Sequence, residues 1–242
     1  PAPVFSISNT TSNICEGTAA DITLTSSTAN AVITLTAVNY NGATGGTYVG
    51  SETFTSGQQI VEPLGNPGNT PITVTYTFEV SANGCTNPVT QQTTITLNPD
   101  PVFSITNNTA SICAGTAADI TLSSPTTSAV IELTAVDYQT ATGGTFTGGE
   151  IFVHGQKIVE TLGNPGNTVL TVTYTFEVSA SGCTNPTTQQ TTITLNPAPV
   201  FSITNTTASI CEGTAADITL ISATANAVIE LTAVDYNGST GG

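Results

Sequence analysis

The chain has 242 residues, a formal net charge of −15 and one basic residue, Lys157, with a single histidine, His154. Nucleic-acid binding depends on Lys and Arg that neutralise phosphates, so this composition argues against nucleic acid as a partner and against anionic membrane surfaces. No apolar run approaches the ~18 residues that a membrane span needs, so we expect no membrane insertion.

The sequence repeats itself with a fixed period. Residues 3–7 return at residues 101–105 and 199–203, and both spacings are equal (101 − 3 = 98 and 199 − 101 = 98). A period of about one small domain indicates separate domains in series rather than a solenoid of short coils. We expect three units, residues 1–98, 99–196 and 197–242. The last is expected to be the N-terminal part of a repeat, in a piece of a longer array, because Gly241-Gly242 aligns with Gly45-Gly46.

The strands expected in the first repeat are short and separated by turn residues. The clearest, residues 72–80, reads Ile-Thr-Val-Thr-Tyr-Thr-Phe-Glu-Val and alternates apolar and polar residues, as a half-buried strand does. No segment carries the 3.6-residue apolar period of an amphipathic helix. In chain order, the expected strands cover residues 4–8, 20–25, 32–40, 47–54, 59–64, 72–80 and 89–97.

Seven short strands in one repeat predict an all-β fold of tandem immunoglobulin-like β-sandwich domains arranged as a rod. The absence of tryptophan departs from antibody-type domains, so the expected likeness is one of architecture. The expected core of the first repeat is Phe5, Ile7, Ile22, Leu24, Ile33, Leu35, Val74, Tyr76, Phe78, Ile95 and Leu97.

The linkers between repeats are short and rich in proline. Pro99 and Pro101 join the first repeat to the second, and Pro197 and Pro199 follow the second. Proline fixes its own φ and restricts the residue before it, so these joints are predicted to be semi-rigid. A stiff rod follows, in which each sandwich adds ~40 Å.

The five cysteines occupy two repeat positions. Cys15, Cys113 and Cys211 share the motif Ile-Cys-x-Gly, whereas Cys85 and Cys183 share Gly-Cys-Thr-Asn-Pro. Zinc sites need close Cys pairs or histidines, and the sequence has neither. Two cysteines per repeat at fixed positions therefore predict disulfides in an oxidising, extracellular location.

Two disulfide pairings are open. Pairing within each repeat would join Cys15 to Cys85 and Cys113 to Cys183, leaving Cys211 without a partner. Strand parity favours a bond from Cys15 to Cys183, because seven alternating strands place Cys15 where one domain ends and the last hairpin where the next begins. Cys113 and Cys85 would then pair with neighbouring units, and a strand count wrong by one would reverse the choice.

No set of residues with catalytic chemistry emerges, and we expect no enzyme, no catalytic residue and no cofactor. His154 has no histidine counterpart in the first repeat and is expected to face solvent in a loop, and Lys157 replaces Gln59 at the surface. The recurring acids are expected to be solvated surface charges, since no dense Asp/Asn loop of the kind that binds calcium is present. A calcium ion at a joint is the alternative considered for them. These acids are Asp21, Asp119, Asp217, Glu52, Glu150, Glu62, Glu160, Glu79 and Glu177.

Three motifs together resemble the repeats of a known family. Ile-Cys-x-Gly opens each unit, Tyr-Thr-Phe-Glu-Val-Ser-Ala-x-Gly-Cys closes it, and Asn-Pro-x-Pro joins copies. They resemble immunoglobulin-like or PKD-like tandem repeats of giant Bacteroidota surface adhesins, including gliding-motility adhesins of the type 9 secretion system. The resemblance implies a cell-surface location and a stalk role.

The expected function is therefore structural: a stalk or fibre module of a large bacterial cell-surface adhesin, stiffened by disulfides and proline linkers. Its expected partners are the neighbouring repeats of the same chain. Two alternatives stay open. The repeats themselves bind carbohydrate or cell surfaces, or they self-associate with other copies into an extracellular filament.

Overall fold

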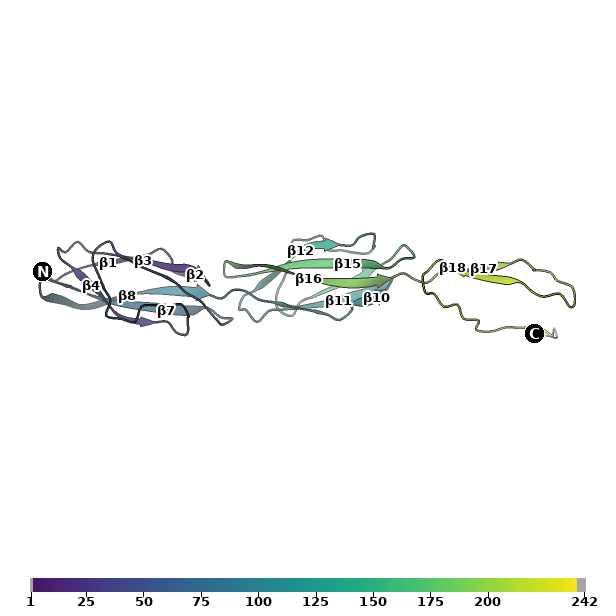
Figure 1. Cartoon of the computed structure of the whole chain (residues 1–242), viewed down its shortest axis with the longest axis horizontal. Coiled ribbons are helices and arrows are strands. Elements are labelled where there is room, and N and C mark those ends of the chain that lie inside the picture. Colours follow the sequence, from purple (N-terminus) through teal and green to yellow (C-terminus); the bar gives the residue numbers. More distant parts are fainter. Residues whose placement is uncertain (1, 239–242) are drawn as a thin grey trace.

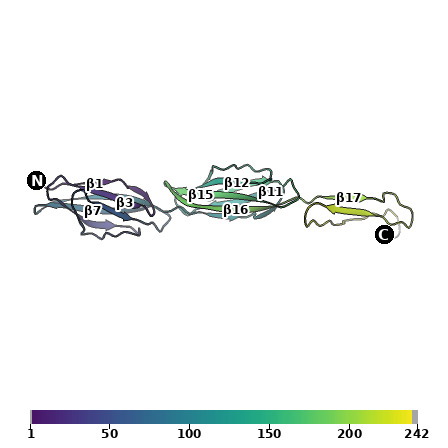
Figure 2. The same cartoon turned by 45° about the horizontal axis from the view of Figure 1, so that its top comes forward.

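The structure is a computed structural model that describes residues 2–238, and these residues contain strands, turns and loops but no helix. Two β-sandwiches and a two-stranded segment follow one another along a single axis, as two views show (Figure 1, Figure 2). The expected third unit, residues 197–242, is described only as far as residue 238.

The first repeat is a sandwich of a three-stranded and a five-stranded sheet. The strand orders are β1-β3-β6 and β2-β8-β7-β4-β5. Neighbouring strands are antiparallel except β2 and β8, which are parallel. The strands are β1 (Ser6–Asn9), β2 (Asn13–Cys15), β3 (Ala19–Thr25), β4 (Val32–Asn39), β5 (Thr53–Phe54), β6 (Gln59–Pro63), β7 (Ile72–Ala82) and β8 (Cys85–Asn98).

The second repeat has the same two sheets, in the orders β14-β11-β9 and β10-β16-β15-β12-β13. The register is conserved across one period: Val74 pairs with Ile95 in the first repeat and Val172 with Ile193 in the second. The strands are β9 (Ser104–Asn107), β10 (Ser111–Cys113), β11 (Thr116–Ser123), β12 (Val130–Asp137), β13 (Glu150–Phe152), β14 (Lys157–Leu162), β15 (Leu170–Ala180) and β16 (Cys183–Asn196).

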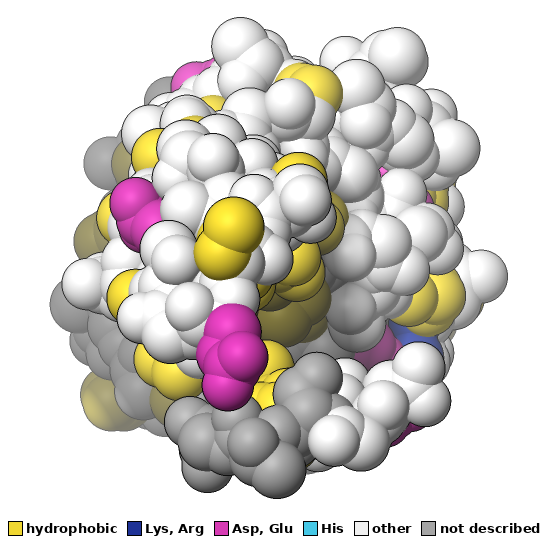
Figure 3. All heavy atoms as spheres, turned by 90° about the vertical axis from the view of Figure 1, so that its right-hand side faces the viewer, with side chains coloured by type: hydrophobic (Ala, Val, Ile, Leu, Met, Phe, Trp, Pro, Cys, Tyr) yellow, Lys and Arg dark blue, Asp and Glu magenta, His cyan; other side chains and the backbone are white. Residues whose placement is uncertain are grey.

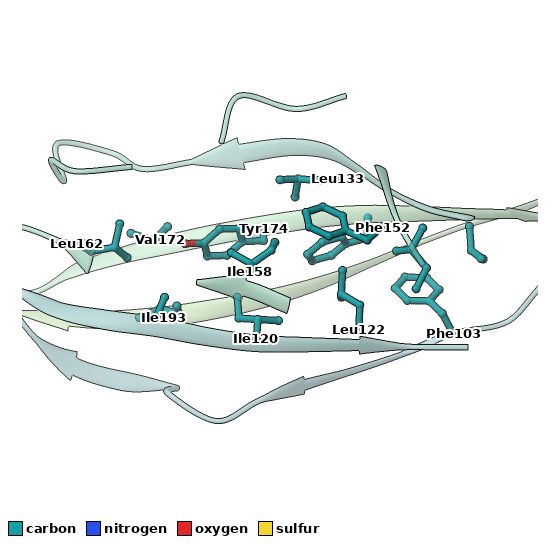
Figure 4. Packing of buried hydrophobic residues seen from close by; sticks show 14 of the residues in the cluster. Phe103, Ile120, Leu122, Leu133, Phe152, Ile158, Leu162, Val172, Tyr174 and Ile193 are labelled. Carbon is teal, nitrogen blue, oxygen red and sulfur yellow. The ribbon is translucent and has the colours of Figure 1, made fainter. Parts of the chain in front are cut away.

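Each sandwich has its own core, and the alternating strands supply it. Val74, Tyr76 and Phe78 of β7 are fully buried, because every second side chain of a strand points to the same face. In the second repeat, Tyr174 and Phe152 lie between the two sheets (Figure 4). The expected core of the first repeat is buried except for Ile7, which is only partly covered.

The first strand is split in both of the first two repeats, so each of these has eight strands rather than the expected seven. β1 pairs with β3 in one sheet, and β2 then crosses to the other sheet and runs parallel to β8. The split leaves Cys15 at the end of the repeat where strand parity predicted it. Cys15 ends β2 beside Asn98, the last residue of β8, at the end of the repeat.

The expected strand over residues 47–54 is wrong for most of its length, because only β5 (Thr53–Phe54) forms. Carboxylates satisfy the backbone of the loop instead of a neighbouring strand. Thr47 N donates to Glu62 Oε2 at 2.7 Å, and Val49 N and Gly50 N donate to the two Glu52 oxygens, both at 2.9 Å. These backbone donors hold the pKa of Glu52 below its ordinary value, with Val49 the largest cause.

Glu62 and its copy Glu160 are buried, so the expectation that they are solvated surface charges is wrong. Glu62 is 1% exposed. Its Oε1 accepts hydrogen bonds from the hydroxyls of Tyr76 (2.6 Å) and Tyr40 (3.0 Å), while its Oε2 accepts from Thr47 N and Oγ1. A buried carboxylate without a cation needs such donors to offset its desolvation.

Gly46 makes this arrangement possible. A Cβ atom at Gly46 would collide with the ring of Tyr40, which lies against the glycine on its way to Glu62. Gly144 and Tyr138 repeat the contact in the second sandwich. In the first two repeats, the second glycine of the Gly-Gly pair therefore leaves room for the tyrosine that bonds to the buried carboxylate.

The segment after the second repeat contains one antiparallel pair, β17 (Phe201–Asn205) and β18 (Ile218–Ser222). Ile203 pairs with Leu220, as Ile7 pairs with Leu24 two periods earlier. Leu220 is 45% exposed where Leu24 is fully buried. No counterpart of the β7–β8 hairpin covers this pair within the described residues, and hydrophobic side chains are visible at this end (Figure 3).

We predict that the sandwiches lose stability above about pH 10. Burial, and then the Glu62 carboxylate, raise the pKa of Tyr40 and Tyr76 above the ordinary value of about 10. A raised pKa in the folded state gives stability that is complete below pH ~10 and is lost as the pH rises. Each fully buried tyrosine removes up to ~1.4 kcal/mol per pH unit there. Denaturant melts between pH 8 and 12 measure this loss.

The matched control replaces the two fully buried tyrosines, Tyr76→Phe and Tyr174→Phe. We expect this variant to be less stable at pH 8 by about 1–3 kcal/mol for each hydroxyl that the buried carboxylate loses. Its stability should depend less steeply on pH above 10. A wild-type free energy of unfolding that stays constant from pH 9 to 12 would contradict the role given to the tyrosines.

Candidate functional site: the joint between the first two repeats

A disulfide bond joins the end of the first repeat to the start of the second. Cys15 ends β2, and Cys183 opens β16 directly after the tip of the β15–β16 hairpin. Their sulfur atoms are bonded, and the Cα atoms lie 5.6 Å apart, within the usual range for a disulfide. The bond spans a sequence separation of 168 residues and lies at the joint.

The remaining cysteines do not follow the pairing within repeats. Cys85, Cys113 and Cys211 are free thiols, and all three are exposed. Cys183, by contrast, is only 2% exposed. The alternatives Cys15 to Cys85 and Cys113 to Cys183 are therefore not the pairing that the structure has.

The peptide linker runs beside the disulfide. Pro99 and Pro101 are buried at the joint, whereas Asp100 between them is exposed. After the second repeat, Pro197 is partly covered and Pro199 is exposed. Both linkers read Asn-Pro-x-Pro, with Asp100 in the first and Ala198 in the second, but they pack differently, and the stapled joint is the more enclosed of the two.

Hydrogen bonds reinforce the joint from both sides. Thr127 N of the second repeat donates to Asn69 O of the first at 2.9 Å. The linker contributes a long contact of 3.4 Å from Asp100 N to Glu16 Oε2. The two repeats are therefore held by the linker, the disulfide and a backbone contact between separate loops.

Polar side chains that are uncovered elsewhere are buried at this joint. Asn98 is 3% exposed, and its Nδ2 donates to Asn13 Oδ1 at 2.7 Å. Ser124 and Thr126 of the second repeat are 6% and 5% exposed, whereas Ser26 and Thr28 of the first repeat are partly exposed. The joint excludes water from groups that already have hydrogen-bond partners.

The only histidine and the only lysine of the chain lie at the surface of the second repeat. His154 is exposed, and its Nδ1 accepts a hydrogen bond from Ser124 N at 3.2 Å, as Ser56 Oγ accepts from Ser26 N in the first repeat. Lys157 Nζ lies 3.0 Å from Asp119 Oδ2 at the surface, and such an exposed ion pair contributes ~0–1 kcal/mol. Neither residue belongs to a cluster with catalytic geometry.

No group of three or more His, Cys, Asp or Glu side chains that could hold a metal ion occurs in residues 2–238. In the same part of the chain, no helix is long and apolar enough to cross a bilayer.

Sequence reasoning identified the cysteines and prolines of the joint but missed its polar residues. Asn66 is 1% exposed, and its Nδ2 donates to Thr70 O and to Leu97 O, both at 2.9 Å. The sequence around Asn66, Leu-Gly-Asn-Pro-Gly-Asn, is by itself typical only of a turn. The recurrence of Asn66 as Asn164 in the Leu-Gly-Asn-Pro-Gly-Asn motif was the signal that pointed to a structural role.

Comparisons with known proteins agree on no family. No protein-family model matches the chain, and no curated protein matches it. Among solved structures, the FdeC adhesin of Escherichia coli is similar at 15% identity and TM-score 0.42, over 82% of this chain and 66% of that chain. The Yersinia pseudotuberculosis adhesin InvE is similar at 18% identity and TM-score 0.28, over 79% of this chain and 58% of that chain.

A third similar structure is the CsuC–CsuE chaperone–tip adhesion subunit complex from the Csu pili of Acinetobacter baumannii. It has 9% identity and a TM-score of 0.30, over 81% of this chain and 99% of that chain. Identities below 20% with TM-scores below 0.5 do not distinguish one β-sandwich function from another. The all-β sandwich assignment rests on the strand pairing of this chain itself.

We predict that the native chain carries one disulfide and three reactive thiols. Peptic digestion without reductant should release a linked peptide pair that contains Cys15 and Cys183. A maleimide added to the folded, unreduced protein should attach to Cys85, Cys113 and Cys211, because these thiols are exposed. A linked pair of Cys15 and Cys85, or labelling of Cys183 without reductant, would contradict the joint described above.

Proposed function

We propose that this chain is a structural stalk module of a large bacterial cell-surface adhesin, which holds a binding region away from the cell. The observation that carries the proposal is the Cys15–Cys183 bond between successive repeats. A bond within a domain stabilises that domain, whereas a bond between domains restrains the angle between them. Restraining that angle is what a spacer requires.

The joint supports this role in three further respects. The linker between β8 and β9 contains Pro99 and Pro101, which limit its freedom. The repeats follow each other along one axis (Figure 1), so restrained joints add length rather than curvature. Third, the net charge of −15 makes neighbouring stalks repel one another in solution.

The proposed location is extracellular, on the cell surface. A disulfide persists in oxidising surroundings, which the cytosol does not provide. The chain offers trypsin-like proteases a single cleavage residue, Lys157, which suits an exposed filament. The motif resemblance to tandem repeats of Bacteroidota adhesins extends the proposal to gliding-motility adhesins and type 9 secretion.

The role needs no catalytic residue and no cofactor, and the proposed partners are neighbouring repeats. Carbohydrate binding by the repeats and lateral bundling with other copies are the competing functions. The covalent bond between successive repeats favours the spacer over either of them.

The experiment measures the stiffness of the joint. Cys85 and Cys113 are exposed thiols at the outer ends of the two sandwiches, so Cys211→Ser leaves them as two dye positions. We expect single-molecule energy transfer to give one narrow distance distribution. The added changes Cys15→Ser and Cys183→Ser should broaden it, because only the linker and hydrogen bonds then hold the joint.

A matched control separates the two restraints of the joint. Pro99→Gly with Pro101→Gly should leave the distribution narrow while the disulfide is present and broaden it further once the disulfide is removed. A broad distribution in the fully stapled chain would overturn the proposal. An unchanged width after removal of the disulfide would show that the bond does not set the stiffness.

A further inference from the structure

The pairing seen in the Cys15–Cys183 disulfide can be extended to the free cysteines, because the cysteine positions recur with the repeat period. Cys113 stands one period after Cys15 (113 − 15 = 98), and Cys183 stands one period after Cys85 (183 − 85 = 98). The bond therefore joins the Ile-Cys-x-Gly cysteine of one repeat to the hairpin cysteine of the next. Cys85 and Cys113 are the unbonded halves of the same pair of positions.

The start of the first repeat is built like the half of the joint that the second repeat supplies. Ser26 Oγ donates to Val4 O at 2.6 Å, as Ser124 Oγ donates to Val102 O at 2.6 Å. Thr28 Oγ1 accepts from Val4 N at 3.1 Å, and Thr126 repeats this bond at the same distance. The surface at the start of the first repeat therefore has these hydrogen bonds without a repeat that covers it.

The two surfaces differ in coverage, and His154 of the second repeat stands where the first repeat has Ser56. Ser124 and Thr126 are buried under the first repeat, whereas Ser26 and Thr28 are partly exposed. Cys183 is buried in its disulfide, and its counterpart Cys85 is exposed. The start of the first repeat therefore lacks only the partner that the second repeat has.

The end of the second repeat is likewise built as the other half of the joint. Asn164 Nδ2 donates to Thr168 O at 2.8 Å and to Leu195 O at 3.1 Å, as Asn66 does one period earlier. Asn196 Nδ2 donates to Ile112 O, repeating the bond of Asn98. Asn164 and Asn196 are only partly covered.

The segment that follows the second repeat does not complete this joint. A cavity of about 400 Å³ lies between Asn167 and Val169 on one side and residues 224–228 on the other. Asn167 is the counterpart of Asn69, whose carbonyl is hydrogen-bonded at the stapled joint. Within residues 2–238, Asn167 O accepts no such bond from Ala225, the counterpart of Thr127.

We propose that Cys85 and Cys113 each bond to a further unit of this same repeat, so that disulfides link each unit to the next along the rod. Cys85 takes the Ile-Cys-x-Gly cysteine of a unit docked ahead of the first repeat. Cys113 takes the hairpin cysteine of a complete unit docked behind the second. The inference rests on the proposed stalk function for its purpose, but its chemistry is testable separately.

Each bond forms by oxidation of two thiols. Two Sγ–H groups lose two protons and two electrons, one S–S bond forms, and a disulfide oxidant of the glutathione or oxidoreductase class is reduced to two thiols. The docked surfaces hold the two sulfurs together, as the Cys15–Cys183 joint does with Cα atoms 5.6 Å apart. Docking therefore selects which thiols pair.

The test places a complete unit ahead of the full chain. A copy of residues 99–196 is joined directly to Pro1, which recreates the linker Asn-Pro-Ala-Pro found at residues 196–199. The protein is refolded with reduced and oxidised glutathione and mapped without reductant. We expect the added copy of Cys113 to be bonded to Cys85, with Cys15–Cys183 retained.

Thiol labelling gives a second reading of the same sample. The five cysteines of the chain and the two of the added unit make seven, and two bonds leave three that react with maleimide. Five reactive thiols with Cys15–Cys183 intact, or a bond from Cys85 to Cys15, would overturn the inference. The control Cys85→Ser should free the added copy of Cys113 and leave Cys15–Cys183 unchanged.

The other end is tested by completing the unit behind the second repeat. Gly242 aligns with Gly144, so a copy of residues 145–196 appended after Gly242 supplies a counterpart of the β15–β16 hairpin. The inference predicts that the appended copy of Cys183 bonds to Cys113, and a bond to Cys211 would overturn it. A narrow distance distribution at the first joint together with wrong pairing here would reject this inference while leaving the stalk function intact.

Discussion

The arrangement of the two repeats depends on two covalent connections at the same place. The peptide linker passes from Asn98 through Pro99 and Pro101, and the Cys15–Cys183 bond lies beside it because β2 ends next to the last residue of β8. Two connections allow far less movement between rigid bodies than one. A third contact, from Thr127 N to Asn69 O, comes from different loops. Noncovalent contacts across the joint are few, so the disulfide is the constraint on which the rod depends.

In the two sandwiches, a buried carboxylate is stabilised without a positively charged side chain. The buried carboxylate of Glu62 is held by tyrosine hydroxyls and the backbone and hydroxyl of Thr47 rather than by Lys or Arg. The same solution recurs around Glu160. This internal network needs no Lys or Arg, and the chain has a single such residue and a net charge of −15. A salt-bridged core would have required cations, and the chain has only Lys157.

Much of the fold and part of the joint could be predicted from the sequence, for identifiable reasons. Alternation over residues 72–80 revealed β7 because side-chain direction in a strand has a period of two. Residues 47–52 were predicted to be part of a strand but form a loop. Their backbone donors bond to the carboxylates of Glu62 and Glu52, and a local sequence pattern does not show such contacts. Burial of Glu62 was missed for the same reason, since its partners Tyr40 and Tyr76 lie far from it in the sequence. Strand parity placed Cys15 at the end of one repeat and the last hairpin at the start of the next, and the Cys15–Cys183 bond that it favoured is the one the structure has.

Pulling on the two ends of the chain measures the central constraint most directly. A bond from Cys15 to Cys183 removes 168 residues from the load path, so the oxidised chain should extend roughly 550–600 Å less than the reduced chain. Bonds within each repeat would remove 140 residues (85 − 15 and 183 − 113, each 70), or roughly 460–500 Å. Single-molecule force extension distinguishes these lengths. The larger difference is the result that a stapled joint predicts, and the smaller difference, or equal lengths, would contradict it.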